Sequence, residues 1–405
     1  MVIDKERSRT SFRDREITSA YVHIPFCRRR CYYCDFPVSI LGDRSRGENS
    51  GAIAQYLDIL LQEIAAFPLL SSPKPLKTVF FGGGTPSLLS VAQVERVLGA
   101  LECRFTLAGG CEVSMEMDPA TFDLEQVKGL AAAGVTRVSL GGQAFQDELL
   151  QRCGRTHRAR DIFEAFDALH RGEIVNISLD LISGLPEQTL AQWEESLEEA
   201  IALSPQHLSC YDLVLEPVTA FGKQFSPGEK PLPDDETAAQ MYRLGSERLR
   251  SAGYEHYEIS NYAQKGFQCR HNRVYWENRP YLGFGMGAAS YVEGRRFARA
   301  RTRKEYFAWV EGGCAVEGSV TGARDRLCET LMLGLRLAEG VSLGEMGERF
   351  GEGAVEAIVS GLERHRAWVE VKENRLRLSD PEGFLFSNQV LAEVFRIADA
   401  IAISA

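Results

Sequence analysis

The sequence lacks a long apolar run, an export signal and an excess of positive charge. No run approaches the roughly 20 apolar residues that cross a bilayer, so we expect a soluble protein, peripheral to a membrane at most. Residues 1–16 interleave five basic with four acidic side chains around no apolar stretch, which argues against a secretory signal or a mitochondrial transit peptide. The net charge of -10 excludes generic binding to nucleic-acid phosphates.

The chain also lacks internal repeats and low-complexity tracts. Its 405 residues, 44% of them hydrophobic, are enough for a large core and two domains. Ten cysteines without an export signal indicate a reducing compartment. We therefore expect a cytoplasmic protein.

Short β-branched runs alternate with stretches of helical period over the first half of the chain, as in a parallel α/β sheet. The predicted strands are residues 20–24, 78–82, 112–116, 137–140, 176–182 and 207–213. The predicted helices are residues 52–67, 91–101, 123–133, 158–171 and 189–203. Six such units predict a barrel that is incomplete.

The pattern changes after this alternation. A Gly/Pro-rich loop over residues 222–233 is a candidate lid before a helix at 235–252. Three later helices and a short β-ribbon resemble a winged helix, although so acidic a chain does not predict DNA binding. The predicted parts are a flexible arm (1–16), a barrel (17–265), a connecting segment (266–322) and a mainly helical C-terminal domain (323–405).

The most informative motif is a cysteine triplet on one short loop. Cys27, Cys31 and Cys34 have the spacing C-x3-C-x2-C. Three thiolates on one loop can hold three irons of a [4Fe-4S] cluster and leave the fourth iron open. The alternatives are structural zinc, a disulfide or buried thiols; zinc requires a fourth ligand that no nearby motif supplies.

Polar groups stand just after several predicted strands or within their last residues, near the edge of a parallel sheet where ligands bind. These groups are the triplet Gly82-Gly-Gly84 with Thr85, then Glu116, Gln143, Arg155 and Asp180. Taken singly, a glycine triplet is usually a turn and Glu116 an ordinary strand-end charge. Together with an open iron they complement a zwitterionic amino acid that carries a ribose and an adenine, a description that S-adenosylmethionine fits.

The order of motifs along the chain is similar to that of one family. It runs from the cysteines through Gly-Gly-Gly-Thr-Pro, Gly-Gly-Gln-Ala-Phe, Gly-Arg-Thr-His and Asp180-Leu-Ile-Ser-Gly-Leu-Pro186 to His271-Asn-Arg-Val-Tyr-Trp276. The chain resembles the radical S-adenosylmethionine family that contains oxygen-independent coproporphyrinogen III dehydrogenases and HemW heme chaperones.

This resemblance implies a partial (β/α)6 barrel with a smaller C-terminal domain, and it assigns site residues. Cys27, Cys31 and Cys34 would bind the [4Fe-4S] cluster. The residues that would contact S-adenosylmethionine are Tyr21, Gly83, Gly84, Thr85, Glu116, Gln143, Arg155 and Asp180. The reduced cluster of such proteins can cleave this cofactor to a radical.

Two differences from the dehydrogenase sequences distinguish between the members of the family. The dehydrogenases resemble C-x3-C-x2-C-x-C, whereas Phe36 stands here at the position of the last cysteine, and the charged tip before Cys27 is short. We therefore expect a heme chaperone that hands heme to an acceptor protein. The alternatives are a coproporphyrinogen III dehydrogenase, which forms protoporphyrinogen IX, and a radical enzyme with another substrate.

The segment His271-Asn-x-x-Tyr-Trp276 resembles the heme-binding signature of the chaperones. It makes His271, Tyr275 and Trp276 candidate heme contacts, with Cys269 as a second candidate iron ligand. Without the resemblance, a hydrogen-bonded histidine beside core aromatics is the simpler interpretation. A basic run over residues 295–304 either faces porphyrin propionates or, as we expect, forms a solvated surface. A histidine common in the chaperones is replaced by Ala289.

Overall fold

A single nine-stranded sheet organises most of the chain. The computed structural model describes residues 17–43, 47–67, 74–316 and 320–401; the predicted arm 1–16 lies outside this part. The strand order is β11-β1-β4-β5-β6-β7-β8-β10-β9. The strands are β1 (Ser19–Ile24), β4 (Leu76–Gly83), β5 (Leu107–Met117), β6 (Arg137–Gln143), β7 (Asn176–Ser183), β8 (His207–Asp212), β9 (Glu255–Glu258), β10 (Asn261–Ala263) and β11 (Leu282–Phe284).

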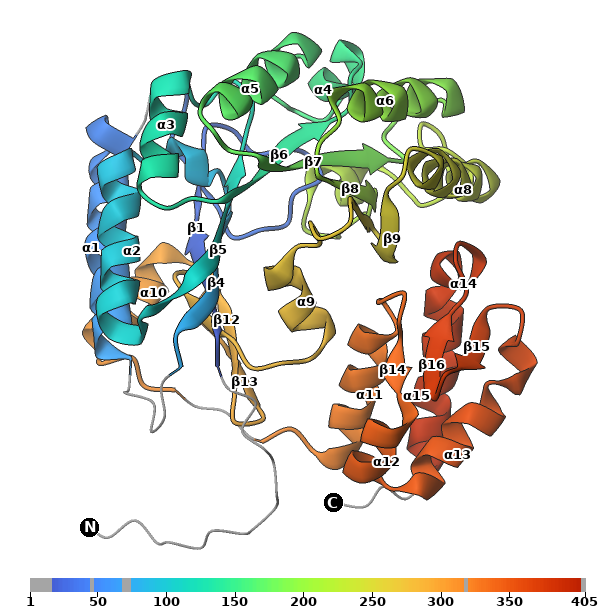
Figure 1. Ribbon diagram of the computed structural model, residues 1–405. Coiled ribbons are helices and arrows are strands. Elements are labelled where there is room, and N and C mark those ends of the chain that lie inside the picture. The colour runs from blue at the N-terminus through green and yellow to red at the C-terminus, as the bar shows by residue number, and fades with distance from the viewer. Residues whose placement is uncertain (1–16, 44–46, 68–73, 317–319, 402–405) are drawn as a thin grey trace, which may run out of the picture.

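The sheet is parallel from β11 to β8, and its helices cover the outer face (Figure 1). The helices of this part are α1 (Gly51–Ala66), α2 (Val91–Phe105), α3 (Leu124–Ala132), α4 (Asp147–Arg152), α5 (Ala159–Arg171), α6 (Leu190–Leu203), α7 (Ala220–Gln224) and α8 (Asp235–Ser251). Capping boxes at Ser90 and Thr189 fix the starts of α2 and α6. The predicted α/β fold is confirmed.

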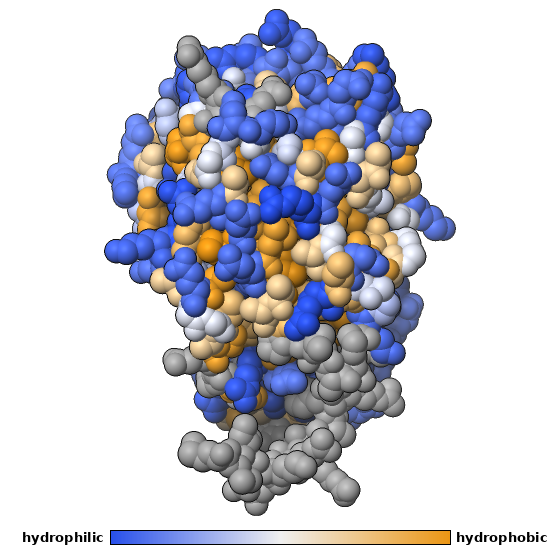
Figure 2. All heavy atoms as spheres, turned by 90° about the vertical axis from the view of Figure 1, so that its left-hand side faces the viewer, coloured by the Kyte–Doolittle hydropathy of each residue, from blue (hydrophilic) through white to orange (hydrophobic). Residues whose placement is uncertain are grey.

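The curved sheet packs its apolar side chains against these helices in one large core. Four of the strands that form it are almost wholly buried, because helices or the barrel interior cover both faces. The face over α1 and α2 mixes hydrophilic side chains with apolar ones that gather near its centre (Figure 2).

Three edge strands were not predicted. β11 extends the sheet beyond β1, while β10 and β9 add antiparallel strands beyond β8. Strands of three or four residues give too short an apolar alternation to be recognised. Part of the candidate lid is helical, since α7 begins just before it and ends within it, at Gln224.

Between the sheet and the C-terminal part lie α9 (Arg270–Trp276), the ribbon β12 (Ala289–Val292) with β13 (Arg295–Ala298), and α10 (Arg303–Glu311). In Figure 1, α9 lies between the strands and α11. The cysteine loop contains the short pair β2 (Phe26–Cys27) and β3 (Ser39–Ile40).

The C-terminal part has its own hydrophobic core, which Tyr242 of α8 joins. It contains α11 (Ala323–Gly334), α12 (Leu343–Phe350), α13 (Glu352–Gly361), α14 (Glu382–Leu385) and α15 (Ser387–Ala400), with the three-stranded sheet of β14 (Val341–Ser342), β16 (Arg375–Leu378) and β15 (Val369–Lys372). No helix in the part of the chain that the structure describes is long and apolar enough to cross a membrane.

Candidate functional site

The cysteine loop leaves the carboxyl end of β1 and lies against the ends of the neighbouring strands. Cys27, Cys31 and Cys34 are free, partly buried thiols. The hydroxyl of Thr85 lies 3.6 Å from Cys27 Sγ, and Arg155 Nη1 lies 3.5 Å from Cys31 Sγ. Both groups donate toward sulfur, as suits a thiolate.

The donor set fits a cluster better than a single ion. Among the described residues, no three His, Cys, Asp or Glu side chains converge as the ligands of one metal ion do. A [4Fe-4S] cluster does not require that, because each thiolate binds a different iron. Burial, the largest cause, raises the pKa of Cys27 to about 12, so iron is needed to hold it as a thiolate.

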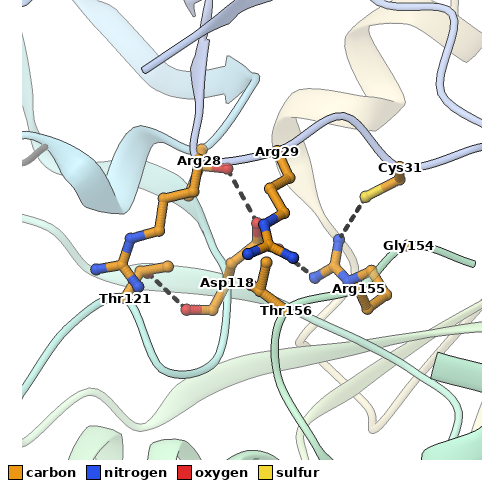
Figure 3. Close-up of a pocket in the computed structure, with 9 residues that line it drawn as sticks. Arg28, Arg29, Cys31, Asp118, Thr121, Gly154, Arg155 and Thr156 are labelled. Carbon is orange, nitrogen blue, oxygen red and sulfur yellow. Dashed lines mark hydrogen bonds and ion pairs between the residues drawn. The ribbon is translucent and has the colours of Figure 1, made fainter. Parts of the chain in front are cut away.

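Asp118 joins the loop to the strands, and it was not among the predicted cofactor residues. It accepts a hydrogen bond from Thr85 Oγ1 at 2.9 Å and forms an ion pair with Arg155 (Figure 3). Burial alone would raise the pKa of Asp118, but the Arg155 guanidinium outweighs it and lowers that pKa. The sequence signal was its position directly after the strand that ends at Met117.

A small cavity opens at this junction. It is lined by Arg28, Arg29, Cys31, Thr85, Asp118, Thr121, Gly154, Arg155 and Thr156. Figure 3 shows Arg155 reaching toward both Cys31 and Asp118 from the segment that follows α4. The cationic side chain therefore fixes the cysteine loop to the strand ends.

Glu116 lies beside the glycine turn that ends β4. Its Oε2 accepts a hydrogen bond from Gly83 N at 2.9 Å. Burial, with Asp180 nearby, raises the pKa of Glu116 to about 8 although that hydrogen bond opposes the shift. Such a carboxyl group is poised to receive a cation, since a positive neighbour would return it to the ionised form.

The glycines of this turn are required by space and by backbone conformation. Gly83 has φ of +112°, in the region that favours glycine. A Cβ at Gly84 would lie 2.6 Å from the carbonyl oxygen of Phe26, which is too close. The triplet therefore lets the cysteine loop approach the strand end closely.

The other predicted cofactor residues lie on the inner side of the same edge. Tyr21 on β1 forms a hydrogen bond through its hydroxyl to His23 Nδ1 at 3.0 Å. Gln143 ends β6 with φ of +69°, a left-handed conformation found in non-glycine residues mainly at constrained sites. Asp180 accepts hydrogen bonds from Ser139 at 2.8 and 3.1 Å, and burial raises its pKa.

The candidate heme residues lie on or next to α9, where one aromatic ring separates His271 from Tyr21: Phe80 stacks on His271 at 5.2 Å and on Tyr21 at 6.2 Å. His271 is 1% exposed, and both of its ring nitrogens have partners: Nδ1 lies 2.8 Å from Thr78 Oγ1, and Nε2 lies 2.8 Å from the hydroxyl of Tyr275. Burial, followed by the nearby Arg137, lowers the pKa of His271 to about 3. The imidazole is therefore neutral, the form that coordinates iron.

The structure does not bring the four heme candidates to one surface. Tyr275 packs edge-on against Tyr281 and His271, whereas Trp276 lies under the guanidinium of Arg336 at 4.4 Å. Cys269 is fully buried, and its thiol points to a carboxylate oxygen of Glu112 at 3.9 Å.

Burial raises the pKa of Cys269 to about 11, which keeps it a neutral thiol. Its exposed fraction is zero, so heme iron would have to reach the thiol through the core.

The basic run over residues 295–304 does not converge on one ligand. Arg299 is buried and pairs with Glu63 at 2.7 Å. Arg296 contacts Tyr281 Oη at 3.0 Å, and Arg301 donates to a loop carbonyl oxygen at 2.9 Å. The expectation of a solvated face is wrong for Arg299. This residue directly follows β13, and its side chain is buried beside Glu63.

Comparison with known proteins gives matches along nearly the whole chain. Residues 21–200 match the radical SAM superfamily, and residues 323–386 match the HemN C-terminal domain. The heme chaperone HemW of Synechocystis sp. is 46% identical over 400 residues, 93% of this chain and 96% of that protein. HemW of Bacillus subtilis is 34% identical over 378 residues, with coverage of 92% and 97%.

One solved structure shares the fold. Coproporphyrinogen III oxidase HemN from Escherichia coli, described as a radical SAM enzyme, has a TM-score of 0.78 with this chain. The match covers 95% of this chain and 90% of that one. At 22% identity it shows the fold alone.

Proposed function

The chain belongs to the HemW family of radical SAM proteins, and from that premise we propose that it is a heme chaperone. In this proposal it binds one [4Fe-4S] cluster, S-adenosylmethionine and heme, and it transfers heme to an acceptor protein. The observation that carries the proposal is the similarity to curated HemW chaperones over more than nine tenths of the chain.

The cofactor set belongs at the carboxyl ends of the strands. Cys27, Cys31 and Cys34 would hold the cluster, which supplies one-electron chemistry to S-adenosylmethionine. The carboxylate of Glu116 would receive the cofactor's ammonium group, because no cation among the described residues forms an ion pair with it. Arg155 would shield the cluster's negative charge, since it already donates to Cys31 Sγ.

Heme would be bound through His271. Its neutral imidazole costs no proton to coordinate iron, and Thr78 holds the ring in one orientation through Nδ1. Coordination through Nε2 requires the hydroxyl of Tyr275 to leave, because that hydroxyl now forms the hydrogen bond at 2.8 Å. Heme binding therefore includes a local rearrangement of α9.

The test is an anaerobic heme titration of the protein with reconstituted cluster. We expect one heme per chain, seen as a saturable Soret band. The His271→Ala variant should lose at least about 100-fold in heme affinity, because it lacks the axial ligand. The His170→Ala variant, at an exposed position on α5, is the matched control and should bind as the wild type does. A wild-type protein without a stoichiometric complex would contradict the proposal.

The intact cofactor residues also support a second candidate, oxidative decarboxylation of coproporphyrinogen III. Phe36 weighs against it, since it stands where the dehydrogenases carry a cysteine. Its ring is 46% exposed on the surface of the cysteine loop. Anaerobic turnover with reductant and S-adenosylmethionine decides the matter: protoporphyrinogen IX as product would favour the enzyme, and its absence would remove this candidate.

A further inference from the structure

A basic pocket lies at the opposite end of the barrel from the cysteine loop. It is formed where β1 and β4 begin and where α9 packs beneath them, and it has a volume of about 220 Å³. Its lining residues are Thr18, Ser19, Lys77, Thr78, Arg270, Arg273, Val274 and Arg279. These residues come from three separate segments of the chain, so the pocket exists only in the folded protein.

The positive charge of this pocket is only partly neutralised. Arg273 pairs with Glu277 at 2.9 Å and also with Glu339, and Arg279 pairs with Glu277 at 2.9 Å. Four cations thus face two carboxylates, which leaves two positive charges unmatched.

The unmatched charges belong to Lys77 and Arg270. Both side chains are exposed, and neither forms an ion pair with any carboxylate in the described ranges. The guanidinium of Arg270 donates only to the carbonyl oxygen of Gly110, at 3.0 Å. Both cations therefore remain available to an anionic ligand.

A buried hydroxyl in the same pocket is also without a partner. Ser19 is 1% exposed, yet its Oγ forms no hydrogen bond with any described residue. Buried hydroxyl groups in folded proteins nearly always have a partner, so an orphaned one at a pocket wall points to a ligand or water there. This observation is independent of the charge count.

The pocket adjoins His271 through two of its walls. Thr78 lines the pocket and lies 2.8 Å from His271 Nδ1. Val274 also lines it and follows His271 by three positions on the same helix face. A group bound in the pocket is therefore one side chain away from the imidazole.

We propose that this pocket binds the two propionate carboxylates of heme and so fixes the edge of the macrocycle next to His271. The inference rests on the proposed heme-binding function and adds the residues that hold the anionic edge. Two propionates carry the charge that Lys77 and Arg270 leave unmatched. The planar guanidinium of Arg270 suits a carboxylate, and the Ser19 hydroxyl supplies one further donor.

This placement separates heme from the cofactor end of the barrel. β1 begins at the basic pocket and ends at the cysteine loop, so its six residues lie between the two sites. The propionates in the pocket would therefore lie at the far end of β1 from the cysteine loop, whereas His271 lies deeper in the barrel and stacks on Phe80 at 5.2 Å.

The experiment is a titration of the cluster-loaded protein with hemin, read at the Soret band. The variants are Lys77→Gln, Arg270→Gln and the two combined; Lys304→Gln, an exposed charge on α10, is the matched control. Each single variant should weaken hemin binding about tenfold and the double variant about 100-fold, since each removes one charge-assisted contact. Thermal unfolding of every variant checks that the fold is kept.

Hemin dimethyl ester, in which both propionates are blocked, is the second probe. The wild type should bind it about 100-fold more weakly than hemin, and the pocket variants should bind it as the wild type does. Wild-type affinity for hemin in the double variant would overturn the pocket alone, and so would equal binding of the ester and hemin by the wild type. A wild type that binds no hemin would instead contradict the proposed function, and the pocket with it.

Discussion

The two ends of the barrel present opposite chemistry on the same strands. At the carboxyl ends, Arg155 pairs with Asp118 and donates to Cys31, Arg28 and Arg29 line the same cavity, and no cation among the described residues forms an ion pair with Glu116. At the amino ends, four basic side chains surround a pocket whose described lining residues include no acidic side chain. The carboxyl ends thus combine thiols and carboxyl groups with arginines, whereas the pocket at the amino ends is basic; in our proposal the first holds the cofactors and the second the heme propionates.

Burial acts in the same way at both ends, although the groups differ. It raises the pKa of Glu116 to about 8 and lowers that of His271 to about 3, so each group is held in its neutral form. A low-dielectric interior disfavours whichever form is charged. A cation beside Glu116 would therefore favour the ionised carboxylate. The imidazole of His271 is neutral near pH 7 and can coordinate a metal without losing a proton.

The largest effect should follow from removing the three cysteines. The variant Cys27→Ala/Cys31→Ala/Cys34→Ala should lose all cluster iron and sulfide, because no other described residues offer three thiols on one loop. Its heme affinity should stay within about twofold of the wild type, since the two sites are separate. Iron and sulfide analysis and heme titration measure both, with the exposed Cys103→Ala as control. Loss of heme binding together with the cluster would break the comparison.

Removing the arginine at the cofactor end should cost stability. The Arg155→Met variant leaves the Asp118 carboxylate without its ion pair. Breaking a fully buried pair costs more, but the Asp118 side chain is 30% exposed, so we expect the free energy of unfolding to fall by about 2–3 kcal/mol. Denaturant unfolding measures it, and Arg155→Met/Asp118→Asn should recover part of the loss. Arg152→Met, which breaks an exposed pair with Glu187, should cost under about 1 kcal/mol. Equal losses in the two arginine variants would contradict the buried-pair account.

Glu116 should make stability fall as pH rises. Its pKa is about 8 in the folded protein, against the ordinary value of 4.5 for a glutamate, so between these values the folded state binds the extra proton. Stability should therefore fall between about pH 5 and pH 8, by about 2 kcal/mol or less because Glu116 keeps partial exposure. In Glu116→Gln the fall should be smaller, whereas the exposed Glu125→Gln should follow the wild type.

The same carboxyl group should make cofactor binding depend on pH. Affinity for S-adenosylmethionine should increase as pH rises toward 8, since the ammonium group is received by the ionised form. Equilibrium binding at several pH values measures this. A variant Glu116→Gln with the same affinity and the same pH profile as the wild type would remove Glu116 from the cofactor site.

The smallest effect should follow from restoring the cysteine of the dehydrogenases. Phe36→Cys changes a half-exposed side chain on the loop surface, so unfolding free energy should change by about 0.5 kcal/mol or less. Anaerobic turnover should still give no protoporphyrinogen IX. If Phe36→Cys did form protoporphyrinogen IX, the residue at position 36, and not the location of the porphyrin site, would distinguish the dehydrogenases from the heme chaperones.

The cofactor end was largely predictable from the sequence, and the heme end was not. Strand-end residues such as Glu116 and Gln143 stand directly after apolar runs, so their common edge follows from parallel strand order. Asp118 has the same signal, but its role depends on its ion pair with Arg155, 37 positions away, which the sequence does not show.

The basic pocket has no signature along the chain. Lys77 and Arg270 are 193 positions apart and meet only because α9 packs under the start of β4. The run that did look basic, residues 295–304, is dispersed by the fold, since Arg299 enters the core and Arg296 turns to Tyr281. Local charge density was therefore a poor guide to a charged site. The predicted boundaries of the connecting and C-terminal parts stay predictions.

The central claim is that cofactors and heme bind at opposite ends of one barrel, and simultaneous binding tests it most directly. Hemin is titrated into the cluster-loaded protein with and without saturating S-adenosylmethionine, under anaerobic conditions. Separate sites predict one heme per chain in both titrations, with affinities that agree within about twofold. Displacement of one ligand by the other would place both at the same end and would contradict the account.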